Sequence, residues 1–340
     1  MKSTKPSYAL VMIAVALAVC VVILGAFTRL RDAGLGCPDW PGCYGHLVMW
    51  PETPEQIAQA EAAYPDAPFE QHKAWPEVIH RYFASALGLL IIGINVLAWR
   101  HRDSRGQPFK LPVFLLALVI AQGLFGMWTV TLKLWPQVVT LHLLGGFTTL
   151  SLLWLLALRL NNHSWAHPNI PLRHWQALKP LALTGMILVC CQITIGGWTS
   201  SNYAALACPE LPTCQGRWLP PMDFAHGFNI FQEIGPNYLG GQMEGEGRVA
   251  IHFMHRMGAI VVALYLGYLI SRMYKYAGGH AMRGHAHLML ALLVIQLGLG
   301  LSNIIWSLPL WVAVAHNAGG ALLLLSLVTL NYRLFRSSAW

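Results

Sequence analysis

Eight stretches of mostly apolar residues constrain this chain more than any other feature, because each is long enough to cross the core of a bilayer. Inside a membrane the backbone finds its hydrogen bonds only in helices or closed barrels. Only 11% of the residues are charged and 56% are hydrophobic, whereas about one quarter are charged in soluble domains. We therefore expect an all-α integral membrane protein with eight transmembrane helices. The expected spans are 8–27, 78–98, 111–131, 137–158, 180–200, 249–270, 286–306 and 310–330.

Basic residues indicate how the chain crosses the membrane. Lys and Arg gather at the termini and in the loops after the second, fourth and sixth expected spans, whereas most carboxylates lie in the opposite loops. Positively charged loops stay in the cytoplasm, so we expect both termini there. The basic residues that give the net charge of +8 line this inner edge of the membrane, so the charge requires no nucleic-acid partner. Histidines beside the inner loops, among them His163 and His285, are expected to be solvated.

The chain also repeats itself. Segment 27–45 reappears as segment 198–216 with the same spacing from threonine to cysteine. Further polar residues follow in one order, and each copy carries four spans, so the second copy enters the membrane from the same side as the first. Such self-similarity indicates a duplicated unit. The further matched residues are His80 with His255, Gln122 with Gln296, and His142 with His316.

The duplication predicts the architecture. We expect two tandem four-helix bundles, residues 1–165 and residues 166–340, related by a pseudo-two-fold axis along the membrane normal. The interior of each bundle offers room for a cofactor.

Four histidines occupy matched places on the second and fourth spans of each copy: His80, His142, His255 and His316. At 1.5 Å per residue, all four lie roughly 5 to 10 Å inside the outer end of their helices. Two imidazoles at one depth are suited to bind a heme iron from opposite faces. A single intramembrane histidine could equally hydrogen-bond to a neighbouring helix, and zinc would need four protein ligands. The repeated pattern favours heme, with His80 paired to His142 and His255 to His316.

The two copies differ beside their first histidine. Glu77 lies three residues before His80, whereas His252 lies three residues before His255. This spacing puts each pair on one helix face. A carboxylate at one site alone predicts chemistry in the first bundle and electron handling in the second. The structural alternative for Glu77 is a helix-end cap near Pro76, and His252 is an alternative ligand to His255.

Four more polar residues lie near the histidines. Arg81 and Arg256 directly follow their histidines, and an unpaired arginine at depth costs about 2.5 to 3.5 kcal/mol. Heme propionates and the outer membrane interface are both suitable partners for them. Gln122 and Gln296 are expected to hydrogen-bond across helices or to the heme.

Two cysteine pairs, Cys37 with Cys43 and Cys208 with Cys214, fall in the outward loops. Oxidising conditions there permit disulfides, so we expect a local bridge in each loop that stiffens a lid over the heme pocket. Thiol redox chemistry or heme delivery is the functional alternative.

Three segments, together with the paired histidine helices, resemble bacterial heme A synthases of the cysteine-containing type: Gly25–Leu30, Gly34–Pro41 and Glu77–Arg81. The resemblance covers essentially the whole chain. It implies oxidation of the C8 methyl group of heme O to a formyl group through a hydroxylated intermediate, giving heme A for terminal oxidases. It also implies a bacterial inner membrane, with the heme sites near its outer face, and partnership with the farnesyltransferase that makes heme O.

The same resemblance assigns roles to the site residues. It makes Glu77 a catalytic residue, His80 and His142 ligands of the substrate heme O, and His255 and His316 ligands of a permanent heme b cofactor. The electron donor and the source of oxygen are not identified by any residue.

Two other functions stay open from the residues themselves. A di-heme electron-transfer protein would keep both hemes unaltered, and a heme carrier would release unmodified heme. The hemes extracted from the purified protein distinguish these three functions.

Overall fold

The computed structural model describes residues 5–104, 108–161, 172–276 and 280–336, and all the regular elements in these ranges are α-helices. Eight of them are long and apolar enough to cross a membrane, which confirms the expected number. Two shorter helices, α2 and α7, lie in the long loops. The helices are α1 (Lys5–Leu30), α2 (Pro54–Ala63), α3 (Gln71–Arg100), α4 (Lys110–Thr131), α5 (Pro136–Asn161), α6 (Leu172–Ser201), α7 (Phe224–Gly227), α8 (Gly245–Tyr276), α9 (His280–Ile305) and α10 (Leu310–Arg336).

Several helices begin before the apolar stretch that predicted them. Helix α3 starts at Gln71 and α8 at Gly245, whereas the expected spans start at 78 and 249. Their first turns are polar, and helical hydrogen bonding continues outside the apolar segment. The apolar segment therefore predicts the membrane-crossing part of a helix and not the first residue of that helix.

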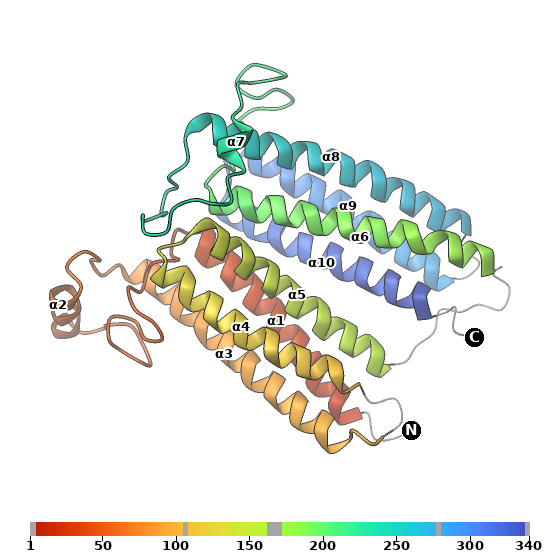
Figure 1. The fold of residues 1–340 in the computed structure, drawn as a ribbon, viewed down its shortest axis with the longest axis horizontal. Helices are drawn as coiled ribbons and strands as arrows, with labels where there is room; N and C mark the ends of the chain where they lie inside the picture. The colour runs from red at the N-terminus through yellow and green to blue at the C-terminus, as the bar shows by residue number, and fades with distance from the viewer. Residues whose placement is uncertain (1–4, 105–107, 162–171, 277–279, 337–340) are drawn as a thin grey trace.

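The long helices pack in two groups of four (Figure 1). In one group α1, α3, α4 and α5 contact one another in a closed ring, and in the other α6, α8, α9 and α10 do the same. The groups meet where α5 packs against α6 and where α10 packs against α1 and α5. Helices far apart in the sequence thus share one core.

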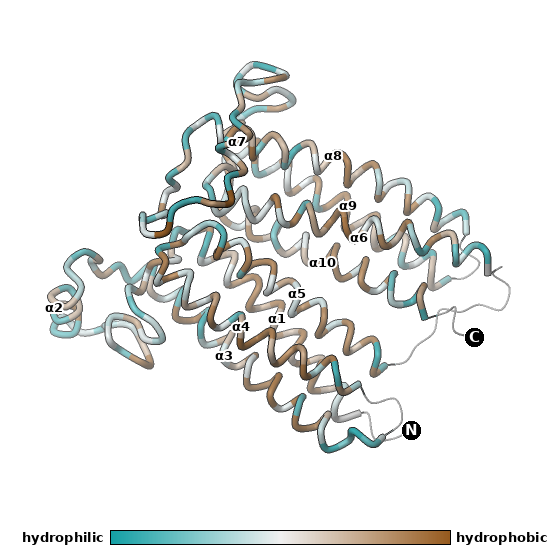
Figure 2. The backbone as a smooth tube through the Cα atoms, in the orientation of Figure 1, coloured by the Kyte–Doolittle hydropathy of each residue, from teal (hydrophilic) through white to brown (hydrophobic). Residues whose placement is uncertain are grey.

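Apolar side chains fill the interior of the molecule and also cover its sides. Leu150, Leu153, Leu266 and Leu327 are almost completely buried between helices. Other apolar side chains, such as Leu264, point outward. Figure 2 shows hydrophobic residues along the middle of the helices and hydrophilic ones at their ends and in the loops. This distribution is that of a protein whose sides face lipid.

One end of the helices carries the long segments 31–70 and 202–244, and both termini lie at the opposite end (Figure 1). We call the end that carries the two long segments the loop end. At the loop end, the segment between α7 and α8 contacts the first group of helices. Trp135 Nε1 donates to the Gln232 carbonyl at 3.2 Å, and Gln137 Nε2 donates to the Ile230 carbonyl at 2.9 Å. Segment 229–241 therefore covers the connection between α4 and α5.

The expectation that His285 is solvated is wrong. His285 is buried, and its Nε2 lies 3.0 Å from the Ser326 carbonyl of α10. Helix α9 already begins at His280, so His285 lies in its second turn, on the face that packs against α10. His163 lies outside the described residues.

Candidate functional site

Two pairs of imidazoles lie inside the two groups of helices. Helix α3 supplies His80 and α5 supplies His142, whose ring centroids are 6.5 Å apart with planes at 89°. Helices α8 and α10 supply His255 and His316, whose ring centroids are also 6.5 Å apart, with planes at 77°. The sequence-based pairing therefore brings together residues that are neighbours in space.

The separation of the rings fits a shared metal atom. An imidazole–metal bond is about 2 Å long and the ring centre lies roughly 1 Å behind the nitrogen, so two axial imidazoles place their ring centres about 6 Å apart. The Nδ1 atoms of His80, His142 and His316 are buried without a hydrogen-bond partner. For the Nδ1 atom of His142, a structural hydrogen bond is therefore no explanation.

The surroundings of each pair suit heme better than zinc. Among the described residues, no group of three or more His, Cys, Asp and Glu side chains could hold a metal ion. Each pair thus offers two nitrogen ligands, whereas a structural zinc site needs four protein ligands. Two axial imidazoles complete the coordination of a heme iron, because the porphyrin supplies the other ligands.

A glycine on the preceding helix lies against each of the four rings. A Cβ atom added at three of these glycines would come within 2.9 to 3.1 Å of a ring atom and would crowd the imidazole, and one added at Gly126 would contact the His142 ring at 3.5 Å. The absence of a side chain lets each helix approach the ring closely. The pairs are Gly25 with His80, Gly126 with His142, Gly196 with His255, and Gly300 with His316.

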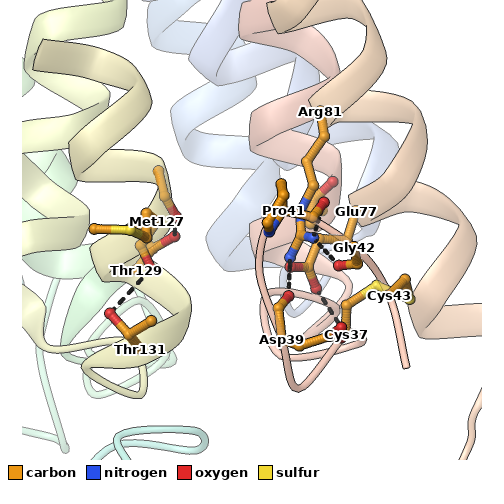
Figure 3. A network of polar contacts seen from close by, with 12 residues as sticks. Cys37, Asp39, Pro41, Gly42, Cys43, Glu77, Arg81, Met127, Thr129 and Thr131 are labelled. Atoms are coloured by element: carbon orange, nitrogen blue, oxygen red, sulfur yellow. Dashed lines mark hydrogen bonds and ion pairs between the residues drawn. A yellow bond between two sulfur atoms is a disulfide. The ribbon is translucent and has the colours of Figure 1, made fainter. Parts of the chain in front are cut away.

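Glu77 joins the first histidine helix to the disulfide loop (Figure 3). Its side chain is 5% exposed, and its Oε2 accepts a hydrogen bond from the Cys37 backbone amide at 3.0 Å. Its Oε1 pairs with Arg81, one turn further along α3. Helix α3 begins at Gln71, so Glu77 lies inside the helix and the interpretation as a helix-end cap is wrong.

Arg81 holds the same loop by its backbone (Figure 3). Its guanidinium donates to the carbonyls of Asp39 at 3.2 Å and Pro41 at 3.1 Å, and also to that of Gly42. The Cys37–Cys43 disulfide closes this loop as predicted. Heme contact by Arg81 stays a prediction, because the hydrogen bonds of its guanidinium within the described residues run to the loop and to Glu77.

The second half repeats this arrangement with a different side chain. His252, 4% exposed, accepts a hydrogen bond from the Cys208 backbone amide through Nδ1 at 3.1 Å. Arg256 donates to the carbonyls of Thr213 at 3.0 Å and Glu210 at 2.9 Å, and to that of Cys208. The Cys208–Cys214 disulfide closes this loop, as predicted. His252 therefore faces its loop, whereas His255 faces His316.

Tyr44 ties the first disulfide loop to the segment before α3. Its hydroxyl donates to the Pro68 carbonyl at 3.0 Å, and its ring packs edge-on against Tyr64 and Phe69. Burial, together with the nearby carboxylates of Glu70 and Glu77, raises the pKa of Tyr44 to about 12. The phenol is therefore protonated near neutral pH and keeps this hydrogen bond.

Glutamines link the histidine helices to their neighbours. Gln296 Nε2 donates to the His316 carbonyl at 3.0 Å, a contact across helices, and Gln122 packs against Gly145. Sequence reasoning missed Gln192, whose Nε2 lies 2.9 Å from the His255 carbonyl and 3.1 Å from its Nδ1. The signal was present, because all three glutamines lie four residues before one of the glycines that contact a ring.

Comparison with known proteins gives one consistent family. Residues 8–328 match the COX15-CtaA model, described as a cytochrome oxidase assembly protein. The chain is 46% identical over 319 residues to a heme A synthase of Shewanella oneidensis, covering 94% of each chain. It is 26% identical over 329 residues to a heme A synthase of Rhizorhabdus wittichii, covering 91% of this chain and 88% of the relative. A heme A synthase of Halalkalibacterium halodurans is 24% identical over 301 residues, which cover 88% of this chain and 87% of that one.

Proposed function

The chain belongs to the COX15-CtaA family of cytochrome oxidase assembly proteins, and on that premise we propose that it acts as a heme A synthase, a membrane oxidoreductase that converts heme O to heme A. The reaction oxidises the C8 methyl group of heme O to a formyl group through a hydroxylated intermediate. Two observations together carry the proposal. The chain holds two histidine pairs with ring centroids 6.5 Å apart, and it is 46% identical to a relative with that name.

The proposed architecture is two bundles, residues 1–165 and residues 166–340, related by a pseudo-two-fold axis along the membrane normal. The closed ring of contacts within each group of four helices supports it. The matching hydrogen bonds of Glu77 and His252 to the two disulfide loops support it further.

Each histidine pair has its own proposed heme. His80 and His142 hold the substrate heme O, and His255 and His316 hold a resident heme b. Bound heme b supplies electron transfer, since its iron changes oxidation state. The difference between Glu77 and His252 supports this division, because a carboxylate stands beside one pair and an imidazole beside the other.

Glu77 is the proposed catalytic residue of the first site. It lies three residues before His80, and Arg81 and the Cys37 amide fix its two oxygens. A buried carboxylate with a fixed orientation is suited to hold or move a proton at a defined place. Arg81 keeps that orientation by binding both the carboxylate and the loop carbonyls.

The proposed location is the inner membrane, with both termini cytoplasmic and the heme sites near the outer face. Arg100, Arg272 and Arg333 lie near the helix ends opposite the loop end, which supports this orientation. The disulfides at the loop end support an oxidising outer compartment there. The farnesyltransferase that supplies heme O and an electron donor of unidentified chemistry are the proposed partners, with the surrounding lipid.

Expression beside a heme O–forming farnesyltransferase tests the function. Hemes extracted from the purified protein and separated by chromatography should include heme O, its hydroxylated form or heme A beside heme b. Heme b alone, in cells competent to make heme O, would favour the electron-transfer function. Net release of unmodified heme would favour the carrier.

A further inference from the structure

Three of the four histidine helices share an arrangement with the helix before them. On α4, α6 and α9 a glutamine lies four residues before the glycine that contacts the ring of the next histidine. Three residues after each of these histidines comes a glycine. The amide of the glutamine fills the space that a side chain at this position would occupy. A Cβ added at these glycines would lie 1.8 to 2.3 Å from the glutamine amide. The pairs are Gln122 with Gly145, Gln192 with Gly258, and Gln296 with Gly319.

Two of these glutamine amides bind the backbone of a histidine. Gln192 Nε2 donates to the His255 carbonyl at 2.9 Å and lies 3.1 Å from its Nδ1. Gln296 Nε2 donates to the His316 carbonyl at 3.0 Å. In a membrane such interhelical hydrogen bonds hold helices together, since apolar packing alone gains little against lipid. The amides of Gln192 and Gln296 therefore join two helices at the level of a histidine, and Gln122 occupies the matching place beside Gly145.

The first helix pair, α1 and α3, departs from this arrangement. Gly25 lies against the His80 ring as the other glycines do, but the residue four positions before it is Val21. The residue three positions after His80 is Phe83, which is 36% exposed. Within the described residues, no side chain donates to the His80 backbone, and its Nδ1 is buried without a partner. A side-chain hydrogen bond from Thr28 Oγ1 to the Pro76 carbonyl at 3.2 Å joins α1 and α3 about one turn closer to the loop end, and at the level of His80 the polar contact of α1 comes from the Val21 backbone and not from a side-chain amide.

We propose that Val21 and Phe83 are positioning residues that make His80 the exchangeable axial ligand. Without an amide at this level, α1 and α3 separate more readily at His80 than the other pairs do at their histidines. Heme entering or leaving the first site passes by detachment of His80, whereas on the opposite side Gln122 fills the space at Gly145, one turn after His142. The inference rests on the proposed function, because it explains why one site exchanges its heme while the other retains it.

Heme transfer to excess apomyoglobin measures this exchange in the full-length protein loaded with hemin. The unchanged protein should lose heme in a fast and a slow phase, and His80→Ala should show only the slow one, because its first site no longer retains heme during loading. The double variant V21Q/F83G grafts the missing pair onto α1 and α3, and it should slow the fast phase roughly threefold to tenfold, as expected for one interhelical hydrogen bond. Gln192→Val removes a pair from the second half and should speed the slow phase by a similar factor. Phe83→Gly alone, which adds room without the amide, is the control and should not slow the fast phase.

Carbon monoxide binding gives a readout that loss of fold alone does not mimic, because it binds a six-coordinate heme iron only after an axial imidazole leaves. The rate of its binding to the reduced protein should fall in V21Q/F83G and rise in Gln192→Val. An unchanged fast phase in a correctly loaded V21Q/F83G protein would overturn the inference. Should V21Q/F83G fail to accumulate, Gln192→Val tests the inference instead. An unchanged slow phase in Gln192→Val would then overturn the inference.

The exchange experiment separates this inference from the proposed function. Hemin transfer requires no turnover, so a chain that makes no heme A could still show the predicted pattern of rates. Conversely, if the fast phase belonged to His255 and His316, the inference would be wrong even in a chain that makes heme A.

Discussion

Glu77 on α3 accepts a hydrogen bond from the backbone amide of Cys37 at 3.0 Å, so the carboxylate beside His80 is fixed to the disulfide loop. His252 does the same for Cys208 at 3.1 Å. The two halves thus share a hydrogen bond from the loop to the helix, but a carboxylate accepts it in the first half and an imidazole in the second. Four predictions follow from this and the related contacts.

Glu77→Ala should abolish conversion of heme O while leaving the amount of protein in the membrane unchanged. The substitution removes the proposed catalytic carboxylate and leaves Arg81 without its acidic partner. Chromatography of extracted hemes measures conversion, and immunoblotting of membranes measures insertion. His252→Ala is the matched control, because it removes the equivalent loop contact in the other half and should keep conversion. A fully active Glu77→Ala protein would rule out the catalytic role, and equal loss in both variants would assign the effect to the loops.

Each histidine pair should hold its heme independently. His142→Ala should lose the heme of the first site and His316→Ala that of the second, because the two pairs lie in separate groups of helices. The pyridine hemochrome spectrum of the purified, loaded protein should then report about half the heme of the unchanged protein in each variant. Complete loss of heme in either single variant would contradict independent sites.

Removal of the first disulfide should lower conversion more than removal of the second. C37S/C43S frees the loop that orients Glu77, whereas C208S/C214S frees the loop bound by His252. Each bridge is expected to contribute about 2 kcal/mol to the stability of the fold, so their thermal midpoints should fall alike. Conversion of heme O per mole of protein distinguishes them. Equal conversion in the two variants would separate the loop from the chemistry.

Arg29 should stabilise the contact between the two groups of helices. Its guanidinium donates to the Ser200 carbonyl at the end of α6, in the second group, and lies 4.1 Å from the centroid of the Tyr203 ring just after α6. Arg29→Leu should destabilise the fold by about 2 kcal/mol, since a hydrogen bond from a charged group and a cation–π contact are lost. The thermal midpoint in detergent measures it.

Arg31→Leu serves as the control for this change. Arg31 lies two residues away, just after the end of α1, and its guanidinium lies 5.7 Å from the centroid of the Phe27 ring on α1. Its replacement should shift the midpoint less. Equal shifts would show that the contact with Ser200 and Tyr203 contributes nothing specific.

Much of the fold and site was predictable because its signals are linear. The eight spans follow from the length of the apolar stretches, and the order of matched cysteines and histidines predicts a duplicated unit. The disulfides followed from two close cysteines in an outward loop. These features depend on residues near one another in the chain or on repeated spacing, so no knowledge of helix packing was needed.

Only the tertiary structure decided which way individual side chains turn. Arg81 binds carbonyls about 40 positions away in sequence, Gln192 reaches His255 from another helix, and His285 is buried against α10 instead of solvated. Each contact depends on how far a helix is rotated and how closely its neighbour approaches. In a membrane helix nearly every face is apolar, so hydrophobic periodicity does not fix that rotation. Packing against glycines and interhelical hydrogen bonds fixes it instead, and these exist only once the helices are assembled.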